Sequence, residues 1–355
     1  MAEGKSWLAG WVAAHRRTAG DRFALPWRNS GMSGSLPRVC DNPQAPMAGQ
    51  NGAMNDLIPE PCSMLFVPAD TDRFLAKAGQ RGADALILDM EDAVAPSAKA
   101  VARANLAAFV PRLQADARVP IYVRVNNEPD LLAADLAAAI RAGADGLLVP
   151  KVETADQVVR LDAEMHRLEA QYQRQPGGIR VVALLESPLA ICSALAIAQS
   201  SPRLSALLFG SEDFGAATGI ESAPESMSVP AQMMALAAAA AGLHPMGLPG
   251  TVAEFTDLNA YRAVAMKAKR IGMRGAICIH PAQVPVINEV FGGTAEEAAK
   301  ARRLLEVFDA SVAAGRGAIA HEGKMIDEPI AIRARRFLQR YDALQARRSR
   351  GREVA

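Results

Sequence analysis

The stretch "IRVVALLESPLA" (residues 179–190) is a continuous apolar run that ends in a carboxylate, Glu186. Strands that are apolar throughout, without alternation, are typical of parallel sheets that are covered on both faces. A second run of this kind, "LSALLFGSED" (residues 204–213), breaks into Glu212 and Asp213. Acidic residues therefore follow two successive buried strands, where each needs a cation or a hydrogen-bond partner.

Six more apolar runs flank these two, and helical patterns separate them. The expected strands are 63–68, 83–90, 120–126, 144–151, 179–186, 204–213, 244–249 and 274–281. Several helical patterns end in glycine just before the next strand, as Gly82 and Gly143 do, which is a common way for a helix to end. Eight strand–helix units in about 220 residues predict an α/β fold, a TIM (β/α)8 barrel.

The chain divides into three expected parts. Residues 59–292 form the predicted barrel, and residues 293–355 form a charged C-terminal helical extension. Residues 1–58 are rich in Gly, Pro, Ser and Asn, so we expect them to be disordered. Two alternatives for this segment stay open: "SWLAGWVAAHRR" resembles a short transit peptide or membrane-surface anchor, or translation starts later, at Met32, Met47 or Met54.

The composition excludes several classes of function. Lys and Arg number 39 against 38 Asp and Glu, so the overall charge gives no reason to expect nucleic acid or anionic membrane as a partner. No apolar run reaches the roughly 18–20 residues of a membrane span. The four cysteines form no Cys-x-x-Cys pair, which indicates neither a zinc site nor a disulfide framework and favours a reducing cytoplasm.

Polar residues gather at the expected carboxyl ends of the strands, where TIM barrels carry their active sites. They are Asp89, Glu91, Asp92, Arg124, Asn126, Lys151, Glu186, Glu212, Asp213 and His280. One such acid alone is better explained by an ion pair or a helix cap, but acids at three strand ends with an arginine favour a site. Carboxylates without cysteine select a hard cation, so we expect Glu186 and Asp213 to hold Mg²⁺. Arg124 could then bind a carboxylate of a small oxo or hydroxy acid.

These residues lie in motifs that resemble the citrate lyase beta subunit-like proteins of the HpcH/HpaI aldolase superfamily. The motifs are "MLFVPADTDRFLAKA", "GADALILDMEDAVAPSAKAVAR", "IYVRVNN", "ALLESPLA", "LFGSEDFGAATG" and "AICIHPAQVPVINEVF". The resemblance runs from Cys62 to Phe291 and resumes at "HEGKMIDEPIAIRARR". It covers most of the chain beyond the first 60 residues.

The resemblance implies a Mg²⁺-dependent lyase that cleaves, or forms, a 3-hydroxyacyl-CoA thioester such as malyl-, citramalyl- or citryl-CoA. The products of cleavage would be a 2-oxo acid and acetyl-CoA. Glu186 and Asp213 would be the metal ligands, and Glu186 would border the substrate. Arg124 would bind the oxo acid, while Glu91 and Asp92 would hold metal-bound waters as an outer shell.

By the same resemblance, Asp327 would act as catalytic acid or base in the site of a neighbouring subunit, which implies a homo-oligomer, a trimer or hexamer. By analogy Arg73, Lys77 and Lys99 would contact the CoA phosphates, although a solvated helix face explains these cations about equally well.

Two residues invite roles that the resemblance does not support. His280 at a strand end could be a ligand or base, but its motif looks architectural. Lys151 could form a Schiff base, which a metal pair makes redundant.

The chain departs from the family pattern at three places. Ala69 stands in "VPAD", Ser187 follows the metal glutamate, and Pro249 and Glu254 alter the loop after the seventh strand. That loop helps to shape the acyl pocket, so the last change puts a preference for citryl-CoA in doubt.

Two rival functions stay open. One is an aldolase on free hydroxy-oxo acids, which would need neither basic residues for CoA nor the segment that carries Asp327. The other is a non-catalytic protein or a subunit that is active only within a complex. That rival predicts loss of Glu186, Asp213 or Arg124, and all three are present.

Overall fold

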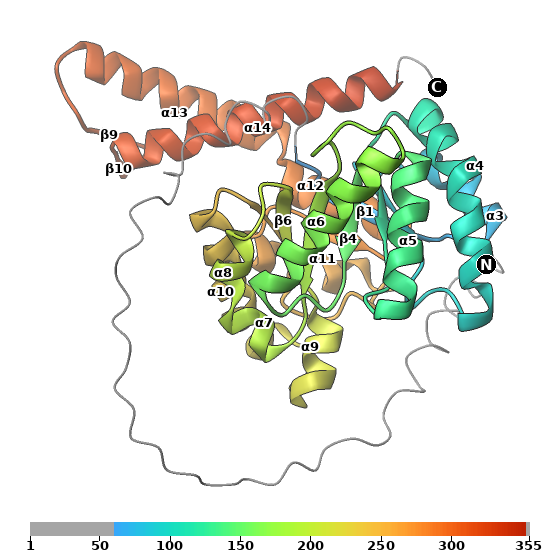
Figure 1. Ribbon diagram of the computed structural model, residues 1–355. Helices are drawn as coiled ribbons and strands as arrows, with labels where there is room; N and C mark the ends of the chain where they lie inside the picture. Colours follow the sequence, from blue (N-terminus) through green and yellow to red (C-terminus); the bar gives the residue numbers. More distant parts are fainter. Residues whose placement is uncertain (1–59, 353–355) are drawn as a thin grey trace, which may run out of the picture. The chain divides into compact units, whose positions relative to one another are not determined.

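The computed structural model describes residues 60–352, so every expectation for residues 1–58 lies outside the described part of the chain. Eight parallel strands lie side by side in the order β7-β6-β5-β4-β3-β2-β1-β8, with helices around them (Figure 1). The strands are β1 (Ser63–Pro68), β2 (Ala85–Asp89), β3 (Ile121–Arg124), β4 (Gly146–Val149), β5 (Arg180–Leu185), β6 (Leu204–Phe209), β7 (His244–Gly247) and β8 (Ala276–Cys278). A parallel bridge between Met246 and Gly275 joins β7 to the segment before β8. The prediction of a TIM barrel with a C-terminal helical extension is confirmed.

The helices follow the strands in regular alternation. Those of the barrel are α3 (Asp72–Leu75), α4 (Lys99–Ala117), α5 (Pro129–Ala142), α6 (Ala155–Gln171), α7 (Pro188–Cys192), α8 (Ala194–Ala198), α9 (Ser211–Thr218), α10 (Pro224–Ala240), α11 (Leu258–Arg270) and α12 (Gln283–Gly292). Within residues 60–352, no helix combines the length and apolar character that crossing a bilayer requires.

Close packing between β3 and β4 depends on one glycine. A Cβ on Gly146 would lie 2.2 Å from Cε1 of Tyr122, so no other residue fits at this position without displacing the ring. Tyr122 and Gly146 are partners in the register of the two strands. The aromatic ring thus occupies the space that the missing side chain leaves.

The strands end earlier than the apolar runs suggest, and this changes how the acids are presented. β6 ends at Phe209, and α9 begins at Ser211. Glu212 and Asp213 therefore lie in the first turn of a helix, where the helix dipole favours negative charge.

The C-terminal extension has a small core of its own. It consists of α13 (Ala295–Ala313), a hairpin of β9 (Ile319–His321) and β10 (Lys324–Ile326), and α14 (Glu328–Arg352). Phe308, Ile326 and Ala331 are buried together within it. The hairpin was not predicted, because its strands have only three residues each and the glycine-containing sequence 316–331 resembles a break between helices.

α14 meets the barrel at the amino ends of the strands. Arg348 donates to the two carboxylate oxygens of Asp84 at 3.1 and 3.0 Å, and Arg340 donates to the Arg274 carbonyl. Asp84 precedes β2 and Arg274 precedes β8, so α14 packs at the end of the barrel opposite to the carboxyl ends of the strands.

A buried ion pair ties α6 to the start of β6. Both terminal nitrogens of Arg203 donate to the Glu169 carboxylate at 2.7 Å, and Arg203 Nε bonds to Asp162. Burial alone would raise the pKa of both carboxyl groups, yet the bonds and charge of Arg203, with Ser201 at Asp162, outweigh it and lower both pKa values.

We expect Arg203→Lys to lower the free energy of unfolding by about 1–3 kcal/mol, because a lysine keeps the charge but cannot donate to both acids at once. The lowered pKa values place this stabilisation at pH values above the unfolded-state pKa of about 4, and it is lost as the pH falls further. Urea unfolding at pH 7 and pH 3 measures both effects. Equal urea midpoints for the wild type and Arg203→Lys at pH 7 would show that the bidentate geometry contributes nothing to stability.

Candidate active site

The ends of β2 and β3 hold a fixed arginine. Asp89 and Arg124 are partners in the strand register, and Arg124 donates from Nε and Nη2 to both Asp89 oxygens at 2.7 and 2.6 Å. The guanidinium carbon lies 4.6 Å from the centre of the Phe66 ring. Both ionic side chains are buried, so the guanidinium has one orientation.

A second layer of charge surrounds this arginine. Arg124 Nη1 lies 2.8 Å from Glu91 Oε2 and 3.5 Å from Asp92 Oδ2. The other Glu91 oxygen lies 2.7 Å from Lys151 Nζ. Asp89 therefore occupies the Nε and Nη2 edge of Arg124, and a ligand on the Nη1 side would share that nitrogen with Glu91 and Asp92.

The ammonium of Lys151 belongs to this network. Burial disfavours its charge, but the adjacent Glu91 carboxylate outweighs that effect and raises the pKa of Lys151 above its ordinary value. A protonated lysine is a poor nucleophile, so the ion pair with Glu91 disfavours Schiff-base formation by Lys151.

Glu186 follows β5 directly and points to the same end of the barrel. Its Oε1 accepts the Lys151 backbone N–H at 2.7 Å, and Lys151 has a left-handed φ of 54°. Its Oε2 accepts no hydrogen bond from any residue in 60–352. Burial, and then the negative charges of Asp213 and Glu91, raise the pKa of Glu186 well above its ordinary value.

Asp213 is the second acid of this pair. No donor in the described part of the chain bonds to its carboxylate. Within residues 60–352 no group of three or more His, Cys, Asp or Glu is arranged to hold a metal ion. Among the described residues neither acid forms an ion pair, and two neighbouring acids of this kind suit a hard cation that takes its other ligands from water and substrate. The donor set fits Mg²⁺, and Glu186 and Asp213 would hold it.

Gly210 leaves the space that this arrangement needs. A Cβ at this position would lie 2.8 Å from Glu186 Oε2 and 2.9 Å from Glu186 Cβ. The first of these atoms is the oxygen without a protein donor, so Gly210 keeps it accessible.

We expect Gly210→Ala to weaken Mg²⁺ binding about tenfold while the protein stays folded, because the added methyl group displaces the Glu186 carboxylate by less than an ångström. Isothermal titration with Mg²⁺ measures the change. Gly317→Ala, at a position with open space around it and no left-handed φ, serves as a control for the general cost of replacing glycine.

The ammonium of Lys99 does not lie where it could contact a phosphate of CoA. Its ammonium donates to the carbonyls of Met90 and Glu91 at 2.7 Å each and to Asn126 Oδ1 at 2.8 Å. All three of its hydrogens are used and the side chain is buried. The prediction that Lys99 binds CoA is therefore wrong: this lysine anchors the loop after β2. Arg73 and Lys77 lie exposed beyond β1 and stay predictions.

His280 lies after β8 against an aromatic ring. Its Nδ1 accepts the Ala282 N–H at 3.2 Å, and its ring centre lies 5.0 Å from that of Phe255. Burial lowers its pKa. The neighbouring Gln283, which sequence reasoning did not single out, is fully buried and donates to the carbonyls of Val252 and Glu254 at 2.8 Å. This part of the motif joins the loop after β7 to β8, as expected for an architectural role.

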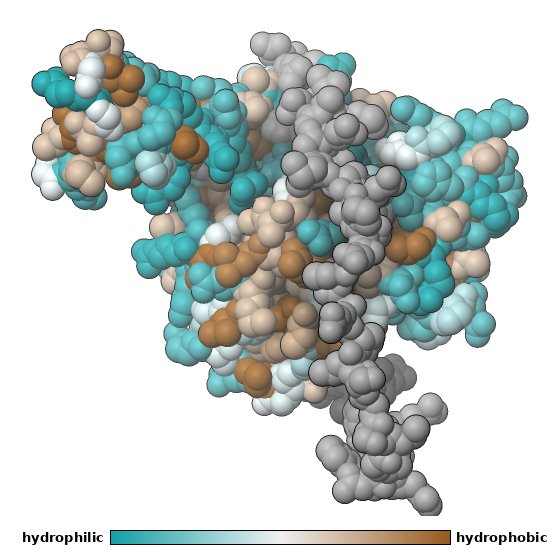
Figure 2. Space-filling view, turned by 60° about the vertical axis from the view of Figure 1, so that its left-hand side comes forward, coloured by the Kyte–Doolittle hydropathy of each residue, from teal (hydrophilic) through white to brown (hydrophobic). Residues whose placement is uncertain are grey.

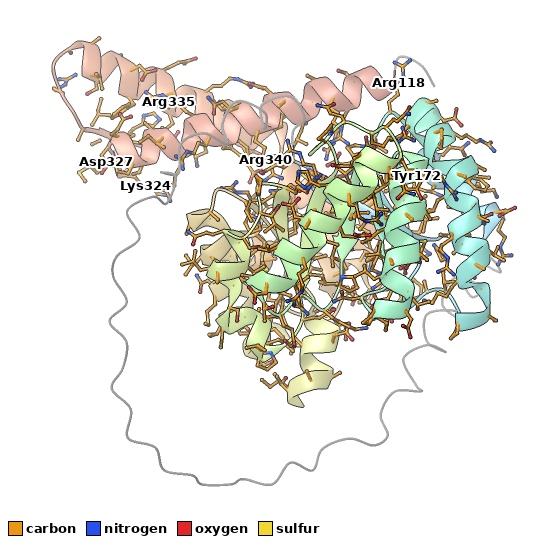
Figure 3. The ribbon with its side chains drawn as sticks, in the orientation of Figure 1. Arg118, Tyr172, Lys324, Asp327, Arg335 and Arg340 are labelled. Atoms are coloured by element: carbon orange, nitrogen blue, oxygen red, sulfur yellow. The ribbon has the colours of Figure 1, made fainter. Side chains whose placement is uncertain are left out.

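Asp327 lies in the extension, away from these groups. It precedes α14, and its carboxylate accepts the Ile330 N–H at 3.3 Å. Figure 3 places Asp327 and Lys324 together at the start of α14, with Arg340 farther along the same helix. Thirteen residues of helix between Asp327 and Arg340 span roughly 20 Å. Because Arg340 is anchored at the amino ends of the strands, Asp327 does not reach the acids at the carboxyl ends of its own barrel.

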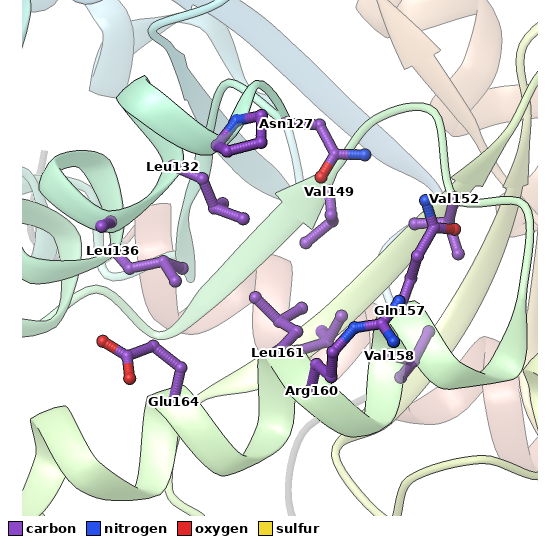
Figure 4. Close-up of a pocket in the computed structure, with 13 residues that line it drawn as sticks. Asn127, Leu132, Leu136, Val149, Val152, Gln157, Val158, Arg160, Leu161 and Glu164 are labelled. Atoms are coloured by element: carbon purple, nitrogen blue, oxygen red, sulfur yellow. The ribbon is translucent and has the colours of Figure 1, made fainter.

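A cavity of about 390 Å³ lies behind the Lys151 loop, between α5, α6 and β4 (Figure 4). Its lining is mostly aliphatic and includes Val149 and Val152, on either side of Pro150 and Lys151. None of the acids described above lines it. Asn127 lies at its edge and donates to the Pro150 carbonyl at 2.8 Å, so the cavity borders the site without being part of it.

Comparison with known proteins identifies the family. The model of the HpcH/HpaI aldolase/citrate lyase family matches residues 62–281. The chain belongs to this family. Citrate lyase subunit beta of Escherichia coli (strain K12) is 32% identical over 283 residues, which are 78% of this chain and 92% of that protein. L-malyl-CoA/beta-methylmalyl-CoA lyase of Cereibacter sphaeroides (strain ATCC 17029) is 31% identical over 74% of this chain and 89% of that protein.

A solved relative has the same fold. The protein CitE from Mycobacterium tuberculosis, in complex with magnesium, acetoacetate and coenzyme A, has a TM-score of 0.63 and 30% identity. The match covers 79% of this HpcH/HpaI family chain and 97% of the other. The similarity to these relatives identifies the chain as a lyase of the citrate lyase beta type.

Proposed function

We propose that this lyase uses Mg²⁺ to cleave a 3-hydroxyacyl-CoA thioester, such as malyl-, citramalyl- or citryl-CoA, into a 2-oxo acid and acetyl-CoA, or catalyses the reverse. The observation that carries the proposal is the pair of neighbouring acids Glu186 and Asp213, neither of which forms an ion pair within residues 60–352, near an arginine fixed by Asp89. The relatives that act on malyl-CoA and that bind magnesium with coenzyme A support it.

Several residues of the chain would each have a separate role in the reaction. Bound at Glu186 and Asp213, Mg²⁺ would supply a Lewis acid for the substrate hydroxyl and its adjacent carboxylate. Arg124, held by Asp89, presents its Nη1 side to the substrate oxygens and stabilises charge there. Glu91 and Asp92 stay close enough to this side to hold ordered water.

The cleavage needs two proton transfers. Water or another base takes the hydroxyl proton, and the O–H electron pair forms the carbonyl of the 2-oxo acid. The carbon–carbon bond breaks at the same time, and its electron pair passes to the thioester as an enolate. The enolate carbon must then take up a proton, and an acid placed for this step contributes about 10²–10⁴-fold. Because Asp327 lies far from the acids of its own barrel, we assign this step to Asp327 of a neighbouring copy in a homo-oligomer, a trimer or hexamer.

A thioester panel tests the proposal. Purified protein is incubated with Mg²⁺ and malyl-, citramalyl-, β-methylmalyl- or citryl-CoA, with and without EDTA, and release of acetyl- or propionyl-CoA is followed. We expect one thioester to be cleaved and EDTA to stop the reaction. If protein that binds Mg²⁺ cleaves free hydroxy-oxo acids and no thioester, the free-acid aldolase replaces this proposal.

A further inference from the structure

The cavity behind the Lys151 loop has mostly aliphatic walls. Nine of the thirteen residues that line it are aliphatic, and among them Leu136, Val149 and Val158 are buried (Figure 4). Its volume of about 390 Å³ gives room for roughly a dozen atoms the size of a water or a methylene group. Water gains little among such side chains, whereas an apolar molecule or chain is stabilised there. The walls therefore suit an aliphatic ligand.

The rim of this cavity has one cation without a protein partner. Gln157, Arg160 and Glu164 line the cavity from one side of α6, at helical spacing. The Glu164 carboxylate accepts from Arg167 at 2.7 and 2.9 Å, which neutralises its charge. Arg160 is exposed and makes no ion pair or hydrogen bond within residues 60–352. Its guanidinium is left to bind an anionic group.

A second donor lies beside this guanidinium. Gln157 accepts the N–H groups of Glu153 and Thr154 at its Oε1, at 2.7 and 3.0 Å, and within residues 60–352 its amide nitrogen donates to no other group. Figure 4 shows the side chains of Gln157 and Arg160 on the same side of the cavity. A guanidinium and an amide N–H together match the two oxygens of a carboxylate, whereas an amine would be repelled.

The cavity shares a wall with the loop that holds Glu186. Val149 and Val152 line it, and they enclose two residues whose carbonyls accept from Asn127 Nδ2 at 2.8 and 3.2 Å. The second of these residues is Lys151, which has a left-handed φ of 54° and donates its N–H to Glu186 Oε1. A molecule packed against the two valines would therefore restrain the loop.

We propose that this cavity binds an aliphatic carboxylic acid of about eight carbons, and that the bound acid restrains the Lys151 loop. The chain of the acid lies among the aliphatic side chains, and its carboxylate accepts from Arg160 and Gln157. The site is independent of the reaction at the mouth of the barrel, because neither Glu186 nor Asp213 lines the cavity.

Calorimetric titration of the full chain with sodium octanoate tests the ligand class without any assay of activity. We expect one octanoate per chain and an affinity that falls about fourfold for each methylene removed, measured with hexanoate and butanoate. Arg160→Gln should weaken octanoate about tenfold and leave the binding of octan-1-ol unchanged. Absence of saturable octanoate binding at millimolar concentration, or an equal effect of Arg160→Gln on the acid and the alcohol, overturns the proposal.

Two neighbouring tryptophan substitutions on α5 test the location. Ala133 lines the cavity and is exposed, so Ala133→Trp should close the cavity without disturbing the core and should abolish octanoate binding. Ala134→Trp is the matched control, because Ala134 is exposed on the same helix and does not line the cavity. Thermal melting confirms that both variants are folded. Octanoate binding by Ala133→Trp with wild-type affinity would place the ligand elsewhere and overturn the proposal.

Amide hydrogen exchange tests the link to the loop. At a concentration about ten times its Kd, octanoate should slow exchange of the Lys151 and Val152 amides about tenfold if opening of the loop releases the ligand. The amide of Ala69, which donates to the Asp89 carbonyl at 2.9 Å beyond β1, should be unaffected. Exchange that stays unchanged at Lys151 and Val152 while octanoate is bound overturns the proposed restraint of the loop.

Discussion

Alanine at Glu186 or Asp213 should reduce kcat/KM with the cleaved thioester by about a thousandfold or more, because several kcal/mol of transition-state stabilisation depend on the metal that these acids would hold. The fold should survive. Glu186 is buried close to the negative charges of Asp213 and Glu91, so its removal relieves repulsion, which offsets the loss of the bond from the Lys151 N–H and should leave the melting temperature about unchanged.

The metal itself gives a second readout. Ligands that bind only the folded state raise the melting temperature, so millimolar Mg²⁺ should stabilise the wild-type protein and not the two variants. Glu212→Gln is the matched control. It removes a charge next to Asp213 but keeps the oxygen that accepts the Val252 N–H at 3.1 Å, so its response to Mg²⁺ should equal that of the wild type. Undiminished turnover in Glu186→Ala would exclude this site.

Arg124→Gln should lower both stability and turnover. The substitution leaves Asp89 and Glu91 buried without their principal cation, and breaking a buried pair in this way costs about 3–5 kcal/mol. Turnover should fall at least a hundredfold, since the fixed donor to the substrate oxygens is lost. Urea unfolding and steady-state kinetics measure the two effects.

A second substitution separates the effect of Arg124→Gln on stability from its effect on turnover. Asp89→Asn in the Arg124→Gln background removes one of the stranded charges, so part of the stability should return while turnover does not. Arg262→Gln is the control for a bidentate pair at the surface, where Arg262 meets Glu289, and should cost less than about 1 kcal/mol. If Arg124→Gln and Arg262→Gln lowered the free energy of unfolding by similar amounts, burial would add nothing to the stabilisation that Arg124 provides.

The barrel was predictable because its strands are buried on both faces. Apolar runs such as 63–68 and 179–186 differ from β1 and β5 by at most one residue at each end. The run 204–213 was too long, since the polar residues after Phe209 start a helix whose first turn contains the acids. Local sequence does not mark this change, because Glu and Asp suit both a strand end and the first turn of a helix.

The sequence predicted which polar residues stand at the strand ends, but it did not predict the contacts between them. Asp89 stood at a strand end, but only the register of β2 and β3 reveals that it faces Arg124 and occupies two of its donors. Lys99 looked like a surface cation because it opens a helix, yet three acceptors from the loop after β2 and from Asn126 surround it. Such partners come from different strands, and a single sequence does not state which strands are neighbours.

The junction of β7 and β8 determines where the barrel can open locally. One bridge joins β7 to the segment before β8, through two bonds of 2.9 Å, from the Gly247 N–H to the Gly275 carbonyl and from the Arg274 N–H to the Pro245 carbonyl, whereas β5 and β6 share a ladder over most of their length. Amide hydrogen exchange should therefore be faster at Gly247 than along β5. Glu186 follows β5 and Arg124 ends β3, and both strands are paired on each side, so transient opening of this junction should leave these two side chains in place.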